Sequence, residues 1–357
     1  SVLVSVRAPV GDVNIAHRDC CIGRGLAAIK PNEHLDSFFL YYLLLTMKPA
    51  IQSHSSGSTF KSINKKTLLD LPCLLPPLPE QKAIARVLRT VQQAKERTEK
   101  VIAAARELKR SLMKHLFTYG PVPFDQTDQV ELKETEIGEV PEGWNIKDLG
   151  AHVRLVTKGS SPKWQGFDYC EDGILFIRSQ NIASGYLDLK ETVRLPQEFN
   201  DTHNNSVISA GDVLVNLVGA SIGRVAVADN RISGANLNQA VAIVRPLNTL
   251  LPEFVSSFLL TEAGQRQIHQ QKKDIARANI SLQDIRNFDV PIPSLDLQKH
   301  VCRILSSVEQ KLQSELYRAQ EIDLLFESLL DNLMTGKVRV PLECGGSDAA
   351  LVDCGEQ

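Results

Sequence analysis

The sequence Leu-Pro-Pro-Leu-Pro-Glu-Gln-Lys at residues 75–82, with the long segment behind it, decides the fold. Its prolines end whatever precedes them, because they lack a backbone N–H and fix φ. From Glu80 to Leu116 there is neither Pro nor Gly, so a helix can continue for about 37 residues, roughly 55 Å. Apolar or small residues recur at steps of four and three, at Val87, Val91, Ala94, Thr98, Val101, Ala105, Leu108 and Leu112. This spacing predicts the seam of a coiled coil.

A second proline-rich stretch, Pro-Ile-Pro-Ser-Leu-Asp-Leu-Gln-Lys at residues 291–299, precedes a second long helical pattern. Its seam comprises Val301, Leu305, Val308, Leu312, Glu315, Ala319, Ile322, Phe326, Leu329 and Leu333. The two stretches share a Gln-Lys pair, and 298 − 81 gives a repeat spacing of 217 residues. We expect the two helices to pair antiparallel; pairing between two copies of the chain is the alternative.

The segments before the two proline stretches also match each other. Residues 2–5 correspond to 213–216, residues 26–31 to 241–246, and residues 62–64 to 279–281. A repeat of this kind indicates two copies of one structural module. Residues 137–212 have no counterpart in the first copy, and the sequence starts at Ser1 in a strand-like run. We therefore expect the first module to lack a comparable segment upstream.

The sequence predicts an α+β fold, with two modules separated by two long helices in an antiparallel coiled coil. The second module shows short strands, with a loop at residues 158–164 between two of them. The expected division is a first module at 1–79, a long helix at 80–118, a linker at 119–136, a second module at 137–296, a long helix at 297–335 and a disordered tail at 336–357.

Composition excludes several classes of protein. At 357 residues the chain exceeds what one core usually serves, and its formal net charge of −2 argues against a generally basic surface. Seven cysteines are scattered without metal-ligand spacing, so we expect no metal site. No apolar run reaches the ~18 residues of a membrane span. An odd cysteine count without a secretory segment suits the reducing cytoplasm.

Catalytic motifs are absent from the sequence. It contains no phosphate-binding glycine loop and no zinc-protease motif. Nor does it contain the Asn-Pro-Pro-Tyr run of amino-methyltransferases or a convincing nuclease triad. Ser221 lies between Gly219 and Gly223, but a strand pattern follows where a nucleophile elbow needs a helix. We interpret this segment as a tight turn and the chain as non-catalytic.

Three polar loops of the second module have side chains suited to DNA. Arg, Gln and Asn can form paired hydrogen bonds with base edges, and Lys can contact phosphates. The candidates are Lys158, Ser160, Ser161, Lys163, Trp164, Arg178, Ser179, Gln180, Asn181, Asn238 and Gln239. Corresponding loops before the prolines carry cations for phosphate contact, Lys61 and Lys65 in the first copy and Lys272, Lys273 and Arg277 in the second. The plainer interpretation is solvated loops whose side chains cap turns.

The chain as a whole resembles the specificity subunit of a type I restriction–modification system. The resemblance rests on residues 76–82 and 291–299 with their helices, the Val-Pro-Glu-Gly-Trp opening at 140–144, and the segments 211–215, 219–223 and 238–239. It covers nearly all of residues 1–336. Two departures stand out: the shortened first module, which puts reading of one half-site in doubt, and Asp-Leu-Gln where the family has Pro-Glu-Gln.

The resemblance implies two target-recognition domains that each read half of a bipartite double-stranded DNA site. It implies two helices that act as a spacer and recruit two methyltransferase subunits, joined by restriction/translocase subunits. Adenine methylation with S-adenosylmethionine belongs to the methyltransferase partner, so no cofactor is expected in this chain. The resemblance also places Asn216, Ser221 and Arg224, with Ser5, Arg7 and Arg24 of the first copy, at the DNA.

Two other functions remain in competition. The first is a coiled-coil adaptor whose modules bind protein, which the near-neutral charge keeps open. The second is a stand-alone enzyme that cleaves or modifies DNA, against which the missing motifs argue. Salt dependence separates the adaptor from the DNA reader, because phosphate contacts weaken steeply with salt and an apolar interface does not.

Overall fold

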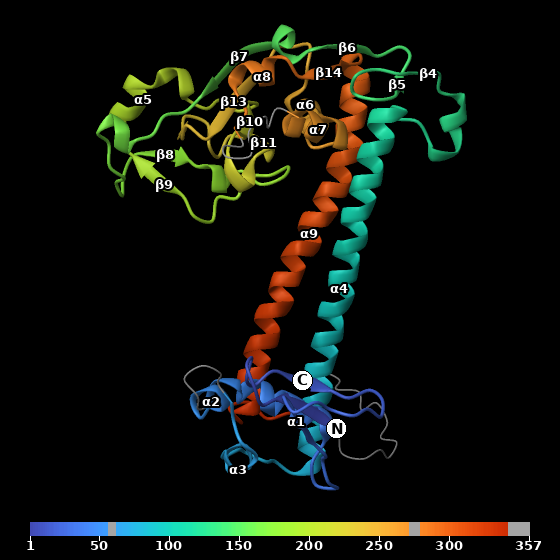
Figure 1. Cartoon of the computed structure of the whole chain (residues 1–357), viewed down its shortest axis with the longest axis vertical. Helices are drawn as coiled ribbons and strands as arrows, with labels where there is room; N and C mark the ends of the chain where they lie inside the picture. Colours follow the sequence, from blue (N-terminus) through green and yellow to red (C-terminus); the bar gives the residue numbers. More distant parts are fainter. Residues whose placement is uncertain (56–61, 271–278, 342–357) are drawn as a thin grey trace, which may run out of the picture. The chain divides into compact units, whose positions relative to one another are not determined.

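The structure, a computed structural model, describes residues 1–55, 62–270 and 279–341. The chain divides into two compact units, unit 1 with residues 1–103 and 313–357 and unit 2 with residues 104–312. Two long helices, α4 (Leu78–Thr118) and α9 (Leu295–Met334), each contribute one part to each unit. Within each unit the two helices run side by side in opposite directions (Figure 1).

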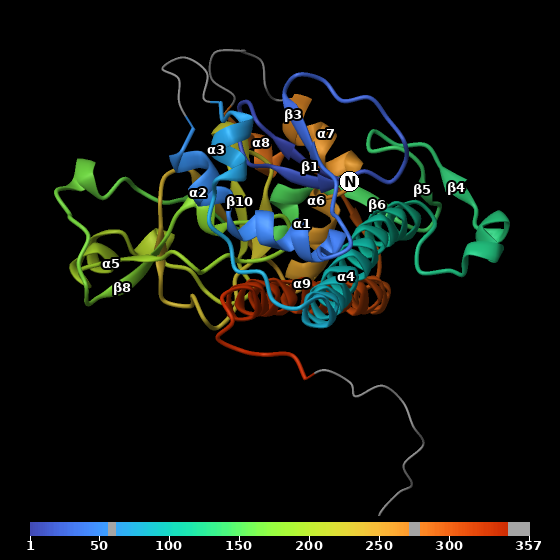
Figure 2. The same cartoon turned by 90° about the horizontal axis from the view of Figure 1, so that it is seen from below.

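Unit 1 contains a three-stranded antiparallel sheet in the order β2-β1-β3. Its strands are β1 (Val2–Ser5), β2 (Val13–Ile15) and β3 (Leu26–Ile29), and its short helices are α1 (Ser37–Thr46), α2 (Lys48–Ser53) and α3 (Lys65–Leu69). In Figure 2, α1 lies between these strands and α4. Leu40 and Leu44 of α1 pack on the sheet, and Phe39 and Tyr42 pack on α4 and α9, so one helix joins the sheet to the long pair.

Unit 2 contains two larger sheets and two small strand pairs. The first sheet has the order β11-β10-β13-β7, with antiparallel neighbours, and the second has the order β12-β8-β9. Its strands are β4 (Leu132–Lys133), β5 (Val140–Pro141), β6 (Asn145–Asp148), β7 (Val153–Lys158), β8 (Ile174–Ile177), β9 (Val193–Leu195), β10 (Val213–Asn216), β11 (Val225–Val227), β12 (Asn236–Leu237), β13 (Val241–Pro246) and β14 (Asp289–Ile292).

Short helices complete unit 2. The α-helices are α5 (Glu198–Thr202), α6 (Pro252–Leu259), α7 (Glu262–Gln270) and α8 (Leu282–Arg286). The 3-10 helices are η1 (Phe124–Gln129), η2 (Leu149–His152), η3 (Lys163–Gln165), η4 (Ser179–Asn181), η5 (Asn204–Ser206) and η6 (Gly219–Ser221).

Strand β10 lies at the centre of unit 2 and is buried on both faces. Successive side chains of a strand point to opposite faces. Val213 and Val215 therefore join a core with Phe254 and Phe258 of α6, and Leu214 joins a separate core with β8 and β12. β10 therefore packs in both cores of unit 2, and this packing holds the ends of the strand in place.

The predicted internal repeat is present in the structure. The order β2-β1-β3 equals β11-β10-β13, and both central strands pair antiparallel with both neighbours. The turns after the central strands also agree: Gly11 N–H donates to Ser5 O at 2.8 Å, and Gly223 N–H donates to Asn216 O at 3.0 Å. Both glycines have φ near +80 to +90°, a conformation that residues with a Cβ rarely adopt.

The seam of α4 differs from the expected one. Val101 and Leu108 are 42% and 48% exposed, so their expected placement in the seam is wrong. The inward positions are Ile84, Leu88, Val91, Lys95, Thr98, Ile102, Ala105, Lys109, Leu112 and Leu116, all buried or half-buried. Lys95 pairs with Asp323 of α9 at 2.6 Å, and Lys109 pairs with Glu309. Lysines thus occupy two inward positions, each one residue after a position of the expected seam (Ala94 and Leu108), because their stems pack while their amines reach α9.

The ten expected seam positions of α9 are buried or half-buried. Other segments differ in detail from expectation. Residues 119–136, expected as a linker, contain η1 and β4, and the His115 ring packs against Phe124. Residues 252–270 form two helices, α6 and α7, and the Thr261 hydroxyl between them accepts a hydrogen bond from Gly264 N–H. Of the expected tail, residues 342–357 lie outside the described part.

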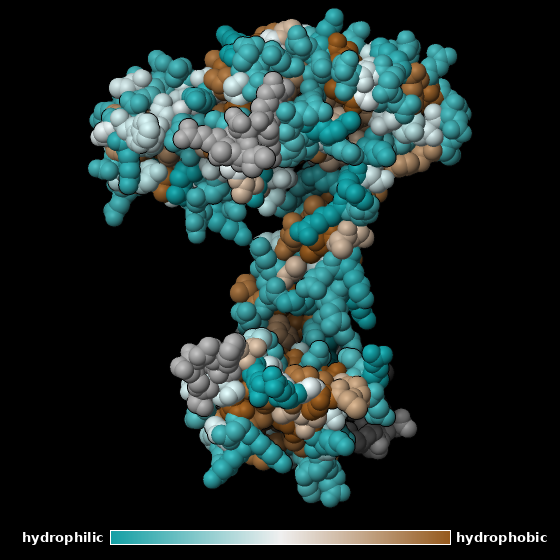
Figure 3. All heavy atoms as spheres, viewed as in Figure 1, coloured by the Kyte–Doolittle hydropathy of each residue, from teal (hydrophilic) through white to brown (hydrophobic). Residues whose placement is uncertain are grey.

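Hydrophilic residues cover most of the visible face of unit 2 in Figure 3, and hydrophobic residues show among them on the visible face of unit 1. Within residues 1–55, 62–270 and 279–341, no helix combines the length and the apolar character needed to cross a bilayer.

Candidate nucleic-acid interface

Four strands of unit 2 bring their polar ends together at one edge. Asn238 N–H donates to Ile177 O at 3.0 Å, which joins the ends of β12 and β8. Ser160 N–H donates to Leu237 O at 3.2 Å, which adds the end of β7. Asn216 Nδ2 donates to Ser179 O at 2.8 Å, which adds the end of β10. We call the residues at this edge the strand-end group: Lys158, Ser160, Arg178, Ser179, Gln180, Asn216, Ser221, Arg224, Asn238 and Gln239.

Gly159 permits the close approach of β7 to β12. A Cβ on this residue would lie only 1.6 Å from Leu237 O, so any other residue would push the two segments apart. Lys158 and Gln239 consequently line one hollow of about 470 Å³. Asp284 also lines it, but its carboxylate accepts a hydrogen bond from Ser281 N–H at 2.9 Å, in the capping box of α8.

The turn after β10 presents two further members of the group. η6 is followed by Gly223 and then by Arg224, whose carbonyl accepts a hydrogen bond from Asn216 N–H at 2.9 Å. The Ser221 hydroxyl donates to Val218 O at 3.4 Å, so the segment is a turn that leads into β11. Lys158, Gln180, Arg224 and Gln239 are exposed, which leaves their side chains accessible to a ligand.

Two expected base-reading residues are structural instead. Asn181 is 1% exposed; its Oδ1 accepts from Arg178 N–H, and its Nδ2 donates to Asp188 O and Glu191 O. Asn216 is fully buried and fastens β10 to η4. The expectation that these amides contact DNA is wrong, because burial places them behind the exposed edge. Arg178 is half-buried, and its Nη2 donates to Glu191 O at 3.3 Å.

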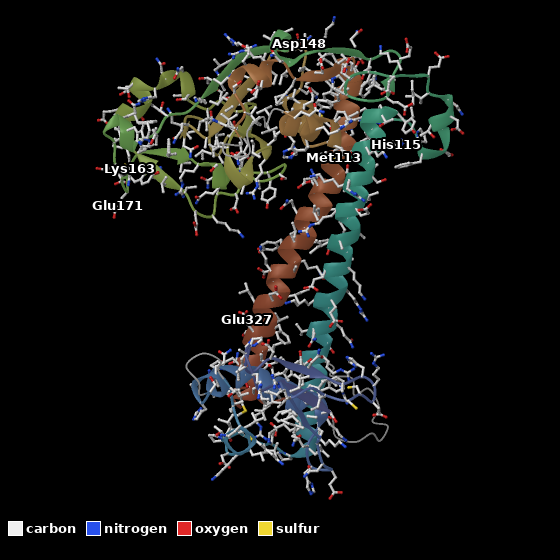
Figure 4. All side chains as sticks on the ribbon, in the orientation of Figure 1. Met113, His115, Asp148, Lys163, Glu171 and Glu327 are labelled. Atoms are coloured by element: carbon white, nitrogen blue, oxygen red, sulfur yellow. The ribbon has the colours of Figure 1, made fainter. Side chains whose placement is uncertain are left out.

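Two other candidates lie away from the strand-end group. Lys163 and Trp164 belong to η3, on the loop that leads from the end of β7 to the start of β8. Figure 4 labels Lys163 and Glu171 on this part of unit 2, before β8. Phe167 anchors this loop through an edge-on contact with Phe199, with ring centroids 5.3 Å apart, while Trp164 is 90% exposed. Ser161 is half-buried.

Unit 1 repeats the backbone of this edge with different side chains. Val6 N–H donates to Gly25 O as Leu217 N–H donates to Ala240 O, both at 2.8 Å. Arg24 therefore occupies the position of Gln239, and Arg7 that of Val218. Arg7, Arg24 and Lys65 are exposed, and the Ser5 hydroxyl donates to Arg7 O at 2.7 Å. Four predicted cations lie outside the described residues, namely Lys61, Lys272, Lys273 and Arg277.

An ion pair that no sequence pattern indicates stabilises the start of β10. Asp212 is fully buried, and its carboxylate accepts from Arg245 Nε at 2.6 Å and Nη2 at 2.8 Å. The hydrogen bond to Asp212 raises the pKa of Arg245, so the guanidinium stays charged. No sequence signal would have paired these residues, which lie 33 positions apart.

The described residues contain no group of three or more His, Cys, Asp or Glu side chains that could hold a metal ion. Burial raises the pKa of the Cys302 thiol to about 12, so this cysteine is not a thiolate at neutral pH. The chemistry available at the strand-end group is hydrogen bonding and charge, which suits recognition of a polyanion with hydrogen-bonding edges.

Comparison with known proteins gives one consistent result. Residues 1–105 and 141–324 match the protein family described as Type I restriction modification DNA specificity domain. The MjaVIII specificity subunit of a type I restriction enzyme from Methanocaldococcus jannaschii is 24% identical over 87% of this chain and 72% of its own length. The EcoBI specificity subunit from Escherichia coli is 29% identical over 84% of this chain and 65% of its own length.

A solved structure shares the fold. The S subunit of a type I restriction–modification system from M. genitalium superposes with a TM-score of 0.62 at 20% identity. The superposition covers 93% of this chain and 82% of that one.

Proposed function

The chain belongs to the family of type I restriction–modification DNA specificity domains. On that premise we propose that each of its modules reads one block of a two-part DNA site. The reading surface is the strand-end group in unit 2 and the corresponding edge with Arg7 and Arg24 in unit 1. In this account the chain supplies sequence specificity to a restriction–modification complex and carries out no chemistry itself. The site is double-stranded DNA, read in the cytoplasm.

One observation carries the proposal. The two modules share strand order, turn geometry and backbone hydrogen bonds at the edge, but the exposed side chains differ. Arg24 of the first module stands where the second has Gln239, and Arg7 stands where the second has Val218. Arg favours guanine and Gln favours adenine in the major groove. Two half-sites of different sequence require the same backbone arrangement with different side chains at the positions that contact the bases.

The long helices and the partners complete the proposal. α4 and α9 act as a spacer that sets the number of base pairs between the two blocks. They also recruit two methyltransferase subunits, which use S-adenosylmethionine, and restriction/translocase subunits join that assembly. Since the chain has 40 basic and 42 acidic residues, tight DNA binding draws on basic surface that the partners add.

A matched pair of substitutions in unit 2 tests the proposal. We expect Gln239→Ala to lower discrimination at one base position by about 5- to 100-fold, the range of one paired base contact. We expect Lys158→Ala, on the neighbouring strand end, to weaken binding to all sequences alike and to reduce the salt slope by about one. Fluorescence anisotropy with site variants at several salt concentrations, on the chain assembled with its methyltransferase subunits, measures both.

The exposed Gln310 on α9 provides the control substitution, Gln310→Ala, which leaves both quantities unchanged. Binding whose strength changes with neither salt nor sequence would contradict DNA recognition and favour a protein partner instead.

A further inference from the structure

Gln81, the glutamine of the first proline stretch, is buried at the start of α4 and makes three hydrogen bonds to backbone. Its Nε2 donates to Pro76 O at 2.8 Å and to His34 O at 3.0 Å. Its Oε1 accepts from Asp36 N–H at 2.9 Å, and Asp36 is the N-cap residue of α1. The amide therefore connects the first turn of the long helix to the start of the helix that carries the sheet.

Gln298 makes the same three contacts in unit 2. It is fully buried; its Nε2 donates to Pro293 O and to Thr249 O, both at 3.0 Å. Its Oε1 accepts from Leu251 N–H at 2.8 Å, and Leu251 is the N-cap residue of α6. The two loop partners are two residues apart in both units, and the proline lies five residues before the glutamine in both.

The residues beside the two glutamines are not repeated. Glu80 forms a two-pronged ion pair with Arg339, at 2.6 Å for each bond, while its counterpart Leu297 is exposed. The common feature is thus the glutamine amide, which uses both N–H groups and its oxygen in each copy. A side chain that both donates and accepts is required at this position, and no charged residue provides that.

The other contacts between each module and its long helix are largely apolar, with a hydrogen bond from the Tyr42 hydroxyl to Gln92 Oε1 in unit 1 as the exception among those described. In unit 1, Phe39 and Tyr42 pack against Ile84 and Leu88 of α4, and in unit 2 Phe254 and Phe258 of α6 share a core with Val301 and Leu305 of α9. Apolar burial is non-directional, so it constrains the angle between such surfaces less sharply than hydrogen bonds do. Hydrogen bonds have a preferred length and angle, so the glutamine sets the direction of the module on the helix.

We infer that Gln81 and Gln298 are positioning residues that hold each recognition module at one angle on its long helix and so restrict the DNA gap to one length. This rests on the proposed function, because the gap is the distance between the two blocks that the modules read. Neither glutamine touches the DNA. Gln81 acts through the N-terminus of α1 and Gln298 through the N-terminus of α6. Each thereby sets the orientation of the DNA-reading edge of its own module.

Selection from a random duplex library, with the full chain assembled with its methyltransferase subunits, tests the inference. The variants are Gln81→Met and Gln298→Met, which keep the length of the side chain and remove its hydrogen bonds. We expect the share of selected sites with the wild-type gap to fall at least about two- to tenfold, the factor for the net free energy of one of the three hydrogen bonds that each variant removes. Neighbouring gap lengths gain that share, while the bases preferred within each block stay the same.

Gln93→Met and Gln310→Met, at exposed positions on the same two helices, are the matched controls and keep the wild-type gap. If Gln81→Met and Gln298→Met both still select sites of a single gap length, the inference is overturned. It is also overturned if either variant loses base preference within a block while the gap length stays unchanged. If a Met variant does not assemble, Gln298→Asn replaces it, because its amide still carries donors and an acceptor but is one methylene too short to keep all three contacts. Asn is expected to broaden the gap less than Met does.

Hydrogen exchange gives a second readout that needs no DNA. Gln298→Met is expected to speed exchange in the peptide around Leu251 and to leave β10 unchanged, and equal protection in variant and wild type would overturn the inference. A wild-type protein that selects no two-block site would instead remove the proposed function itself, so the two failures are distinguishable.

Discussion

At the scale of single residues, Asp289 shows how a carboxylate can weaken the native state. It lies opposite Asp148 in the β14–β6 pair. Desolvation by burial raises the pKa of Asp289, and repulsion from Asp148 and Glu136 raises it further. Since the raised pKa lies above the value in the unfolded chain, protonated Asp289 stabilises the fold fully below the unfolded pKa. That contribution is lost as pH rises through the folded pKa.

Replacing this carboxylate therefore gives a pH-dependent gain in stability. We expect Asp289→Asn to melt at a higher temperature than the wild type at pH 7 to 8, because the uncharged amide is not repelled by Asp148. The difference should shrink as pH falls and disappear near pH ~4, where the unfolded Asp protonates. Thermal unfolding across a pH series measures it, with the exposed Asp128→Asn as control. A wild type that melts higher at neutral pH would disagree with this assignment.

Residue roles at the candidate site were only partly predictable. Polar residue type and position after a strand correctly indicated that Lys158, Ser160, Arg178 and Gln239 gather at one edge. Burial separated Asn181 and Asn216 from them, and no local pattern reports burial, because it depends on which segments pack in front. The two positioning glutamines carried a usable signal, since each sits in a duplicated stretch before a long helix.

At the scale of elements, α4 tests how far a heptad pattern defines a seam. The pattern fits two registers that share Val91, Thr98, Ala105 and Leu112 and differ by one position in between. Apolar residues favoured the register with Val101 and Leu108, yet the structure turns Ile102 and Lys109 inward. In that register Lys95 and Lys109 also form ion pairs with α9, and partners so distant in sequence are invisible to a periodicity.

Two neighbouring residues make this difference measurable. Ile102 is 6% exposed, so we expect Ile102→Ala to lower the free energy of unfolding by about 2–4 kcal/mol through lost packing. Val101→Ala, one position away and exposed, should change it by less than about 0.5 kcal/mol. Both changes introduce Ala into the same helix turn, so helix propensity contributes little to the contrast. Urea unfolding monitored by circular dichroism distinguishes the two registers. A larger loss of stability in Val101→Ala than in Ile102→Ala would support the register with Val101 instead.

At the scale of the whole molecule, the repeat is the property that the sequence predicted best. Matching strands, turns and proline stretches indicated two copies of one module, and the structure shows the same strand order and turn hydrogen bonds in both. The second sheet of unit 2 was less predictable. β12 pairs in parallel with β8 across about 60 residues, a pairing that depends on tertiary packing more than on local propensity.

The central claim is that this chain specifies a two-part DNA site. The most direct measurement is selection from a random duplex library by the chain assembled with its methyltransferase subunits, followed by sequencing. We expect one motif with two blocks of fixed bases, separated by a gap of one length without base preference. A single block would confine reading to one module, and no enrichment at all would contradict DNA recognition by this chain.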